Sequence, residues 1–116
     1  MQQTTSIKPL TPVLAGAGSP TNAYTSPDAN TSAIIKHLRL YNGSTADVTI
    51  QIWAVPFGGS PSIANQLCNQ TIRGYQTIAP FDHEIMLGPQ WSLEIQASTA
   101  AVVGLNGTYF EFQTVA

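Results

Sequence analysis

The chain alternates apolar and polar residues over several short stretches, the pattern of half-buried β-strands. The clearest case is residues 47–56 (DVTIQIWAVP), where one face is formed by Val48, Ile50, Ile52 and Ala54. The opposite face of this predicted strand carries Thr49, Gln51 and Trp53. The aromatic side chain of Trp53 on the polar face indicates that this face is also covered, either by a partner or by another part of the chain.

Residues 32–42 (SAIIKHLRLYN) are rich in β-branched and large apolar residues and predict a second long strand. Simple alternation places Ile34, Leu38 and Leu40 on one face with Lys36, and on the other Ile35, His37, Arg39 and Tyr41. The Asn42–Gly43 pair that follows favours the positive φ angles of a tight turn. We therefore expect residues 32–42 and 47–56 to form a hairpin.

Further strand signals follow. Residues 74–81 and 83–87 predict two short strands broken near Pro80, and residues 91–99 alternate cleanly again. Residues 100–114 predict either one long strand bent at Gly107 or two strands. Residues 62–72 (SIANQLCNQTI) fit a short helical turn or a strand equally well.

No window shows a sustained helical repeat of apolar residues, and seven to nine short strands are separated by turn signals. This arrangement is typical of an all-β antiparallel sandwich. Jelly-roll and immunoglobulin-like topologies both fit the pattern, and a jelly-roll-like sandwich over residues 28–116 is our working expectation.

Residues 1–27 differ from the rest because they contain four prolines and the flexible stretch Ala15–Pro20. Proline disfavours helices and central strands, so these residues predict an extended arm with a short edge strand around Ser6–Leu14. The arm lies either across its own sandwich or on a neighbouring subunit. Its apolar residues are interface candidates: Ile7, Leu10, Val13 and Leu14.

Only 9% of the residues are charged, whereas soluble domains carry roughly 25%. A neutral polar surface is inexpensive to desolvate, which suits a protein covered by neighbours in an assembly. The few cations are scattered, so we expect neither nucleic acid nor an anionic membrane as a partner. The sequence has no apolar run of spanning length and no standard signal peptide, which predicts synthesis in the cytosol.

Candidate chemistry is sparse. His83 lies between Asp82 and Glu84, but consecutive residues of a strand point to opposite faces, so we expect no metal site there. There is no Gly-x-Ser-x-Gly motif and no phosphate-binding loop, and the six acids are dispersed. We predict no enzyme, no catalytic residue and no cofactor. The single cysteine, Cys68, lies among apolar neighbours and is interpreted as a buried or half-buried small hydrophobe.

The polar faces of the two longest predicted strands provide the remaining interface candidates: His37, Arg39, Tyr41 and Trp53. Aromatic residues on such a face bring large contact area at low entropic cost. The alternative is that both faces are buried within the subunit, one against the second sheet and one under the arm.

Four segments resemble small structural proteins of tailed-bacteriophage virions: AIIKHLRLYN (Ala33–Asn42), PFGGSPSIAN (Pro56–Asn65), MLGPQWSLEIQAST (Met86–Thr99) and VVGLNGTYFEF (Val102–Phe112). The stretch that they span, Ala33–Phe112, covers about two-thirds of the chain and omits the arm. The family pattern commonly has Gly-Asp where this chain has Gln90–Trp91.

The resemblance implies a β-sandwich that assembles, often as a homotrimer, on a phage particle. It implies a capsid decoration (cement) protein that bridges subunits of the major capsid protein and resides in the virion after synthesis in the host bacterial cytoplasm. A tail, neck or fibre component is the alternative, followed by a carbohydrate-binding module that would stack sugars on Trp53, Tyr41 and Trp91.

Overall fold

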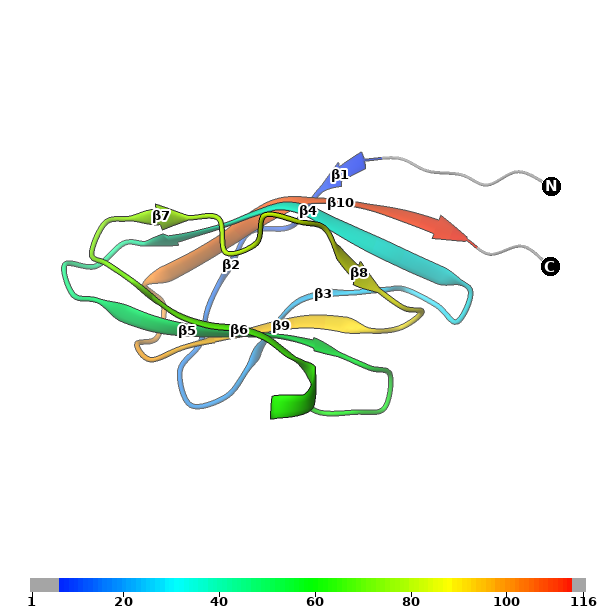
Figure 1. The fold of residues 1–116 in the computed structure, drawn as a ribbon, viewed down its shortest axis with the longest axis horizontal. Coiled ribbons are helices and arrows are strands. Elements are labelled where there is room, and N and C mark those ends of the chain that lie inside the picture. Colours follow the sequence, from blue (N-terminus) through cyan, green and yellow to red (C-terminus); the bar gives the residue numbers. More distant parts are fainter. Residues whose placement is uncertain (1–6, 114–116) are drawn as a thin grey trace.

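The computed structural model describes residues 7–113 (Figure 1). Their regular secondary structure consists of β-strands and one short 3₁₀ turn, joined by loops. The strands are β1 (Ile7–Pro9), β2 (Val13–Leu14), β3 (Thr21–Thr25), β4 (Thr31–Asn42), β5 (Val48–Val55), β6 (Gln66–Ile72), β7 (Thr77–Ile78), β8 (Ile85–Leu87), β9 (Ser92–Ala97) and β10 (Val103–Gln113). A short 3₁₀ turn, η1 (Ile63–Asn65), precedes β6, so residues 62–72 contain both a helical turn and a strand. The predicted all-β class is confirmed.

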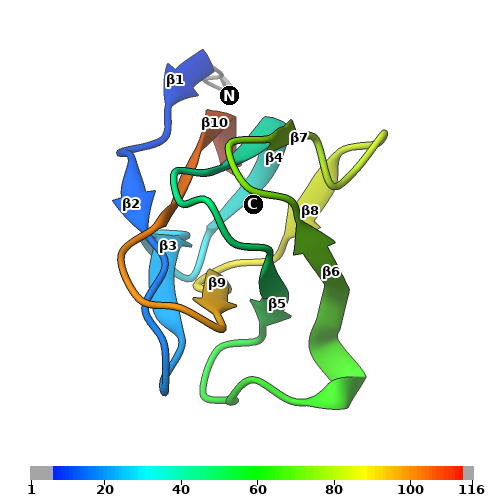
Figure 2. The same cartoon turned by 90° about the vertical axis from the view of Figure 1, so that its left-hand side faces the viewer.

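Two antiparallel sheets pack face to face (Figures 1 and 2). Sheet A has the order β1-β10-β4-β7, with β2 also paired to β10 and β8 to β4, and sheet B has the order β3-β9-β5-β6. β1 and β2 can be counted as one interrupted strand, and so can β7 and β8. The strands then pair from the two ends of the chain inward: β1/β2 with β10, β3 with β9, β4 with β7/β8, and β5 with β6. This nested pairing is the jelly roll.

The predicted hairpin of residues 32–42 with 47–56 is wrong. β4 belongs to sheet A and β5 to sheet B, so residues 43–47 cross between the layers. Asn42 and Gly43 both keep negative φ angles, so the tight turn that an Asn–Gly pair favours is not formed. The apolar faces of β4 and β5 are buried against each other across the sandwich, which one shared sheet would not allow.

The side chain of Asn42 organises this crossing. It is fully buried, and its Nδ2 donates to the carbonyls of Ala46 (2.7 Å) and Ile72 (3.0 Å). Its Oδ1 accepts from the amide (3.0 Å) and the hydroxyl (2.8 Å) of Ser44. Because Ile72 ends β6, Asn42 ties the β4–β5 crossing to the β6–β7 crossing beside it.

A β-bulge in the middle of β4 decides which of its residues face the core. His37 and Leu38 together lie opposite Gly107 of β10, and His37 takes a left-handed backbone conformation (φ 55°). The extra residue shifts the alternation by one. The buried apolar residues of β4 are therefore Ala33 and Ile35 before the bulge, and Leu38 and Leu40 after it. The predicted inward position of Ile34 is wrong for this reason.

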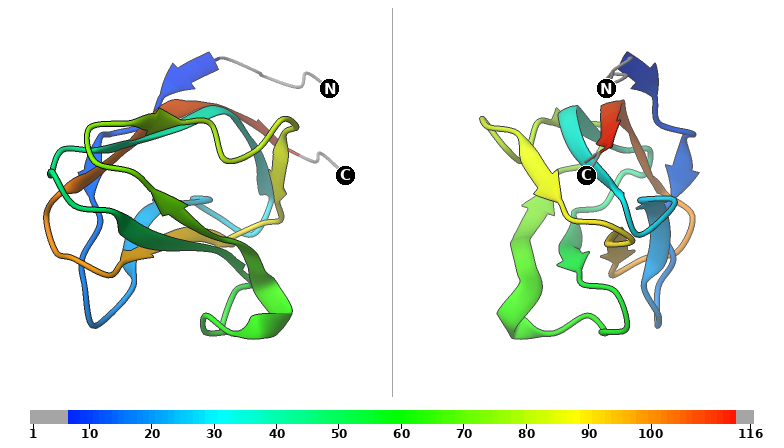
Figure 3. Two further views of the ribbon diagram at one scale, coloured as in Figure 1. Left: turned by 60° about the vertical axis from the view of Figure 1, so that its left-hand side comes forward. Right: turned by 90° about the vertical axis from the view of Figure 1, so that its right-hand side faces the viewer.

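Other predicted elements agree with the structure. Residues 103–113 form one long strand that is irregular at Gly107, and the strand pair around Pro80 is broken as expected. Figure 3 shows the segment between β7 and β8 leaving the sheet before the chain returns to it.

The described part of the predicted arm belongs to the sandwich. Residues 7–25 supply β1 and β2 to sheet A and β3 to sheet B, and Leu10 (3% exposed) and Ala15 join the core. The division at residue 27 therefore does not coincide with a break in the sheets. Residues 1–6 of the predicted arm lie outside the described residues.

A second contact joins the sheets near the end of β10. The hydroxyl of Tyr24 in β3 donates to Glu111 Oε2 in β10, and the rings of Tyr24 and Tyr109 pack at a tilt of 47° with centroids 4.6 Å apart. Burial, and then the neighbouring Glu111 carboxylate, raise the pKa of Tyr24 above its usual range, so the phenol remains a hydrogen-bond donor.

Gly107→Ala should destabilise the fold by about 1–3 kcal/mol, because a Cβ there would lie 3.2 Å from three backbone atoms of β4 at the bulge. The matched control is Gly104→Ala in the same strand, where a Cβ meets no atom within 4 Å. The control should change stability by less than about 0.5 kcal/mol in urea unfolding. Equal losses for the two variants would contradict the proposed role of Gly107.

Asn42→Ala should lower the free energy of unfolding by about 3 kcal/mol, because it leaves buried carbonyls at Ala46 and Ile72 without their donor. Urea unfolding monitored by tryptophan fluorescence measures this loss. Asn106→Ala, at an exposed position of β10, is the control and should have little effect. A loss below 1 kcal/mol for Asn42→Ala would show that the crossing does not depend on this side chain.

Candidate interaction surface

An apolar row crosses the outer face of sheet A from edge to edge. The register pairs Ile7 with Phe110, Phe110 with Ile34, and Ile34 with Met86, so one residue from each of β1, β10, β4 and β8 lies in line. Directly paired residues of a sheet project from the same face at close range. We call these four side chains the apolar row.

The apolar row is open to solvent in the subunit. Ile7 is 72% exposed and Met86 61% exposed, while Phe110 and Ile34 are half-buried and lie outside the core cluster. The ammonium of Lys36 lies 5.0 Å from the centre of the Phe110 ring and borders the row. A contiguous exposed apolar patch of this kind marks an interaction site more often than chance.

A second apolar area lies on the same face of sheet A, next to the second half of β4. Leu14 pairs with Gly104, which pairs with Tyr41, and both Leu14 and Tyr41 are exposed. Because Gly104 has no side chain, a hollow of about 250 Å³ lies between them. This hollow is shallow and largely apolar.

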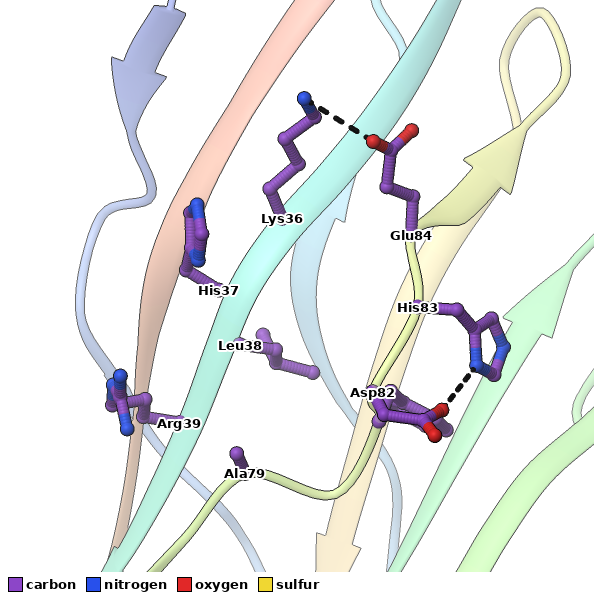
Figure 4. Close-up of a pocket in the computed structure, with 9 residues that line it drawn as sticks. Lys36, His37, Leu38, Arg39, Ala79, Asp82, His83 and Glu84 are labelled. Carbon is purple, nitrogen blue, oxygen red and sulfur yellow. Dashed lines mark hydrogen bonds and ion pairs between the residues drawn. The ribbon is translucent and has the colours of Figure 1, made fainter.

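Between the two apolar areas, sheet A opens at the bulge (Figure 4). β8 pairs with the first half of β4 and β7 with its second half, so among residues 7–113 nothing pairs with the middle of β4 on that side. The result is a solvent-open cavity of about 610 Å³ between the middle of β4 and residues 79–84.

The cavity has a mixed lining that includes side chains of both charges. From β4 come Lys36, His37 and Arg39, and from the facing segment come Asp82, His83 and Glu84. Lys36 Nζ pairs with Glu84 Oε1 at 3.2 Å. The imidazole Nδ1 of His83 lies 3.1 Å from Asp82 Oδ1, and this hydrogen bond lowers the pKa of the exposed Asp82 carboxyl.

This arrangement does not bring the two histidines together. His37 and His83 project on opposite sides of the cavity in Figure 4, and Glu84 turns toward Lys36 rather than toward His83. Among residues 7–113, no three His, Cys, Asp or Glu side chains are close enough to hold a metal ion. The cavity supports ionic and hydrogen-bonding contacts with a partner surface.

The sequence-predicted interface residues fall into two groups. Those on the outer face of sheet A are Ile7, Leu14, His37, Arg39 and Tyr41. Val13 is half-buried against the core, and Leu10 and Trp53 (6% exposed) are buried within the subunit. Trp53 does not belong to the main core cluster. It lies in β5, the strand that η1 contacts.

Sequence reasoning missed Ile34, Phe110 and Met86. Ile34 was assigned to the wrong face because the bulge at His37 is not visible in the alternation. A signal for Phe110 was present, since residues 109–112 (YFEF) carry aromatic side chains on both faces of one strand. Met86 becomes part of the row only through the pairing of β8 with β4.

Cys68 is half-buried in β6, and burial raises the pKa of its thiol to about 11. The thiol is therefore protonated at neutral pH and packs partly against the core. Separately, none of the helical structure within residues 7–113 is long and apolar enough to cross a membrane.

No protein-family model and no curated protein sequence matches the chain. A solved structure of Bacillus endospore appendages, described as a novel family of disulfide-linked pili, is similar in fold, with a TM-score of 0.56 and 12% identity over 100% of this chain and 93% of that one. At this identity the similarity shows the jelly-roll-type sandwich alone.

Weaker similarity links the chain to a T13 particle of infectious bursal disease virus, with a TM-score of 0.38 and 6% identity. There the match covers 93% of this chain and 30% of the viral chain.

The Cys68 thiol should react with Ellman's reagent roughly a hundred-fold more slowly in the folded protein than in urea at pH 7.5, because its pKa is raised from 9.0 to about 11. A Cys68→Ser/Thr71→Cys double variant, with its thiol at an exposed position of the same strand, is the control and should react quickly in both states. Equal rates for native Cys68 and the control would contradict the assignment of a buried, protonated thiol.

Proposed function

We propose that this protein is a non-enzymatic structural subunit that assembles with copies of itself and with another virion protein through the outer face of sheet A. The observation that carries the proposal is the apolar row, which runs across β1, β10, β4 and β8 and is open to solvent in the subunit. Covering Ile7 and Met86 alone would contribute about 1.5–3 kcal/mol for each side chain.

The low charge of the chain supports the same proposal. With 9% charged residues, the chain has few ions to desolvate, and two of those on this face, Lys36 and Glu84, are already paired at 3.2 Å. The charges that the face does carry, at Lys36, Arg39 and Glu84, line the cavity and can set the orientation of a partner.

In its specific form, the proposal is a homotrimeric capsid decoration protein of a tailed phage, bound to the major capsid protein. This form rests on the resemblance of residues 33–112 to small phage virion proteins. Such a subunit would stabilise the head by adding buried area across junctions between capsid subunits. A tail, neck or fibre position would use the same face with a different neighbour.

Two observations bear on the alternatives. Trp53 is buried and Trp91 is partly buried against the core, so neither presents the fully exposed ring that a sugar-stacking platform needs. The 116 residues also contain one cysteine. A single thiol can join two copies through one disulfide, but a disulfide-linked polymer needs two such bonds per subunit. We therefore propose that assembly depends on non-covalent contacts.

The test is binding to virus particles assembled without this protein. The wild-type protein should co-sediment with them, and Met86→Lys should weaken binding at least tenfold, because a charge replaces an apolar contact at an exposed position. Thr99→Lys, which adds the same charge in the exposed loop before β10, is the control and should bind normally. Failure of the wild-type protein to bind any such particle would refute the proposal.

A further inference from the structure

The jelly roll leaves four lateral sheet edges, and three of them carry features that block pairing with another strand. The β1/β2 edge is interrupted at residues 10–12 and contains Lys8, Pro9 and Pro12. The β7/β8 edge is interrupted at residues 79–84, where Pro80 and three consecutive ionisable residues project.

The third edge, β3, is protected by its geometry. It has a bulge between Asn22 and Tyr24, and it is flanked by Pro20 and Pro27. Bulges and prolines at strand edges prevent the regular ladder that an incoming strand needs.

The fourth edge, β6, has one bulge, at Leu67 near its start, and residues 68–72 after it pair regularly with β5. Its seven residues (QLCNQTI) include no charge, no proline and no glycine. Within residues 7–113, β6 pairs only with β5, and it forms the outer margin of sheet B in Figure 2. A strand of this length with an uncharged free edge is a template for pairing.

The backbone groups of β6 that face outward can be identified. Thr49 of β5 accepts from the Ser98 amide (2.9 Å) and donates to the Ser98 hydroxyl (3.0 Å), so its backbone groups point away from β6. Its partner in β6, Thr71, therefore directs its own N–H and C=O toward the free edge, and so does Asn69 two residues earlier.

We propose that β6 pairs antiparallel with β6 of a second copy across a twofold axis near Asn69, which joins two B sheets into one continuous sheet. This inference deepens the proposed structural role and rests on it. Asn69 is the midpoint of the strand, and its outward N–H and C=O would exchange two hydrogen bonds with the same groups of the other copy.

The composition of β6 favours a second copy over a different partner. In a twofold contact each residue meets residues of the same strand, so any charge would face a like charge. β6 has no charge, and its exposed Asn69, Gln70 and Thr71 can each donate and accept hydrogen bonds. Such side chains are complementary to themselves.

Analytical ultracentrifugation of the full-length protein tests the pairing. Asn69→Lys should reduce the mass of the wild-type assembly twofold, because it places two like charges together at the axis. Asn69→Pro should do the same, since it removes an outward N–H but no bond between β6 and β5. Thr99→Lys should keep the wild-type mass, and circular dichroism should show that all variants are folded.

Cross-linking provides a second measurement. In a Cys68→Ser/Asn69→Cys variant the two new thiols should form an intermolecular disulfide, because directly paired residues of this kind have Cα atoms about 5.5 Å apart. Cys68→Ser/Thr99→Cys is the control and should remain reduced under the same mild oxidation.

The outcomes separate this inference from the proposed function. If Asn69→Lys and Asn69→Pro leave the mass unchanged and Asn69→Cys does not cross-link, the pairing of β6 is overturned even when the wild type binds particles. Another outcome is that the wild type is monomeric in solution and binds particles, whereas Asn69→Pro does not bind them. In that case the β6 edge pairs with a strand of another protein, and self-pairing is overturned. If the mass falls twofold as expected but the wild type binds no particles, the pairing holds and the proposed function fails.

Discussion

The bulge at His37–Leu38 is the constraint on which the rest of the structure depends. Without the extra residue, β4 would alternate uniformly, and either Ala33 and Ile35 or Leu38 and Leu40 would face solvent. The bulge buries both pairs, at the expense of a left-handed His37 and a backbone contact that only glycine at position 107 allows without displacement. The amide of Leu10 donates to the Gly107 carbonyl (2.9 Å), so the N-terminal strand segment is also anchored at this point.

The same bulge creates the candidate interaction surface. By shifting the alternation, it turns Ile34 outward into line with Ile7, Phe110 and Met86. It also lies between the parts of β4 that pair with β7 and β8, where the cavity with Lys36 and Glu84 on its walls opens. The bulge therefore accounts for the apolar row and adjoins the cavity.

The two candidate contacts would act in different directions. The outer face of sheet A presents side chains, so its specificity depends on shape and on the few charges around the row. The β6 edge presents backbone groups, which give geometry but little side-chain selectivity, and an uncharged strand suits pairing with itself. A subunit with one face contact and one edge contact can join neighbours both beneath it and beside it. Neither contact requires a catalytic group, and the low charge of the chain is consistent with both.

Local sequence patterns determined the all-β class, most strand positions and the break near Pro80, because alternation and turn residues act over a few neighbours. The pairing of strands depended on tertiary structure. Asn42–Gly43 reads locally as a tight hairpin turn, but burial of Asn42 against Ala46 and Ile72 makes it a crossing between sheets. Ile34 reads locally as a core residue, but one extra residue opposite Gly107 turns it to the surface. Both outcomes depend on partners 30 or more residues away, namely Ile72 for Asn42 and β10 for β4. A local pattern contains no information about contacts over that distance, and for this reason the interaction surface emerged only from the folded chain.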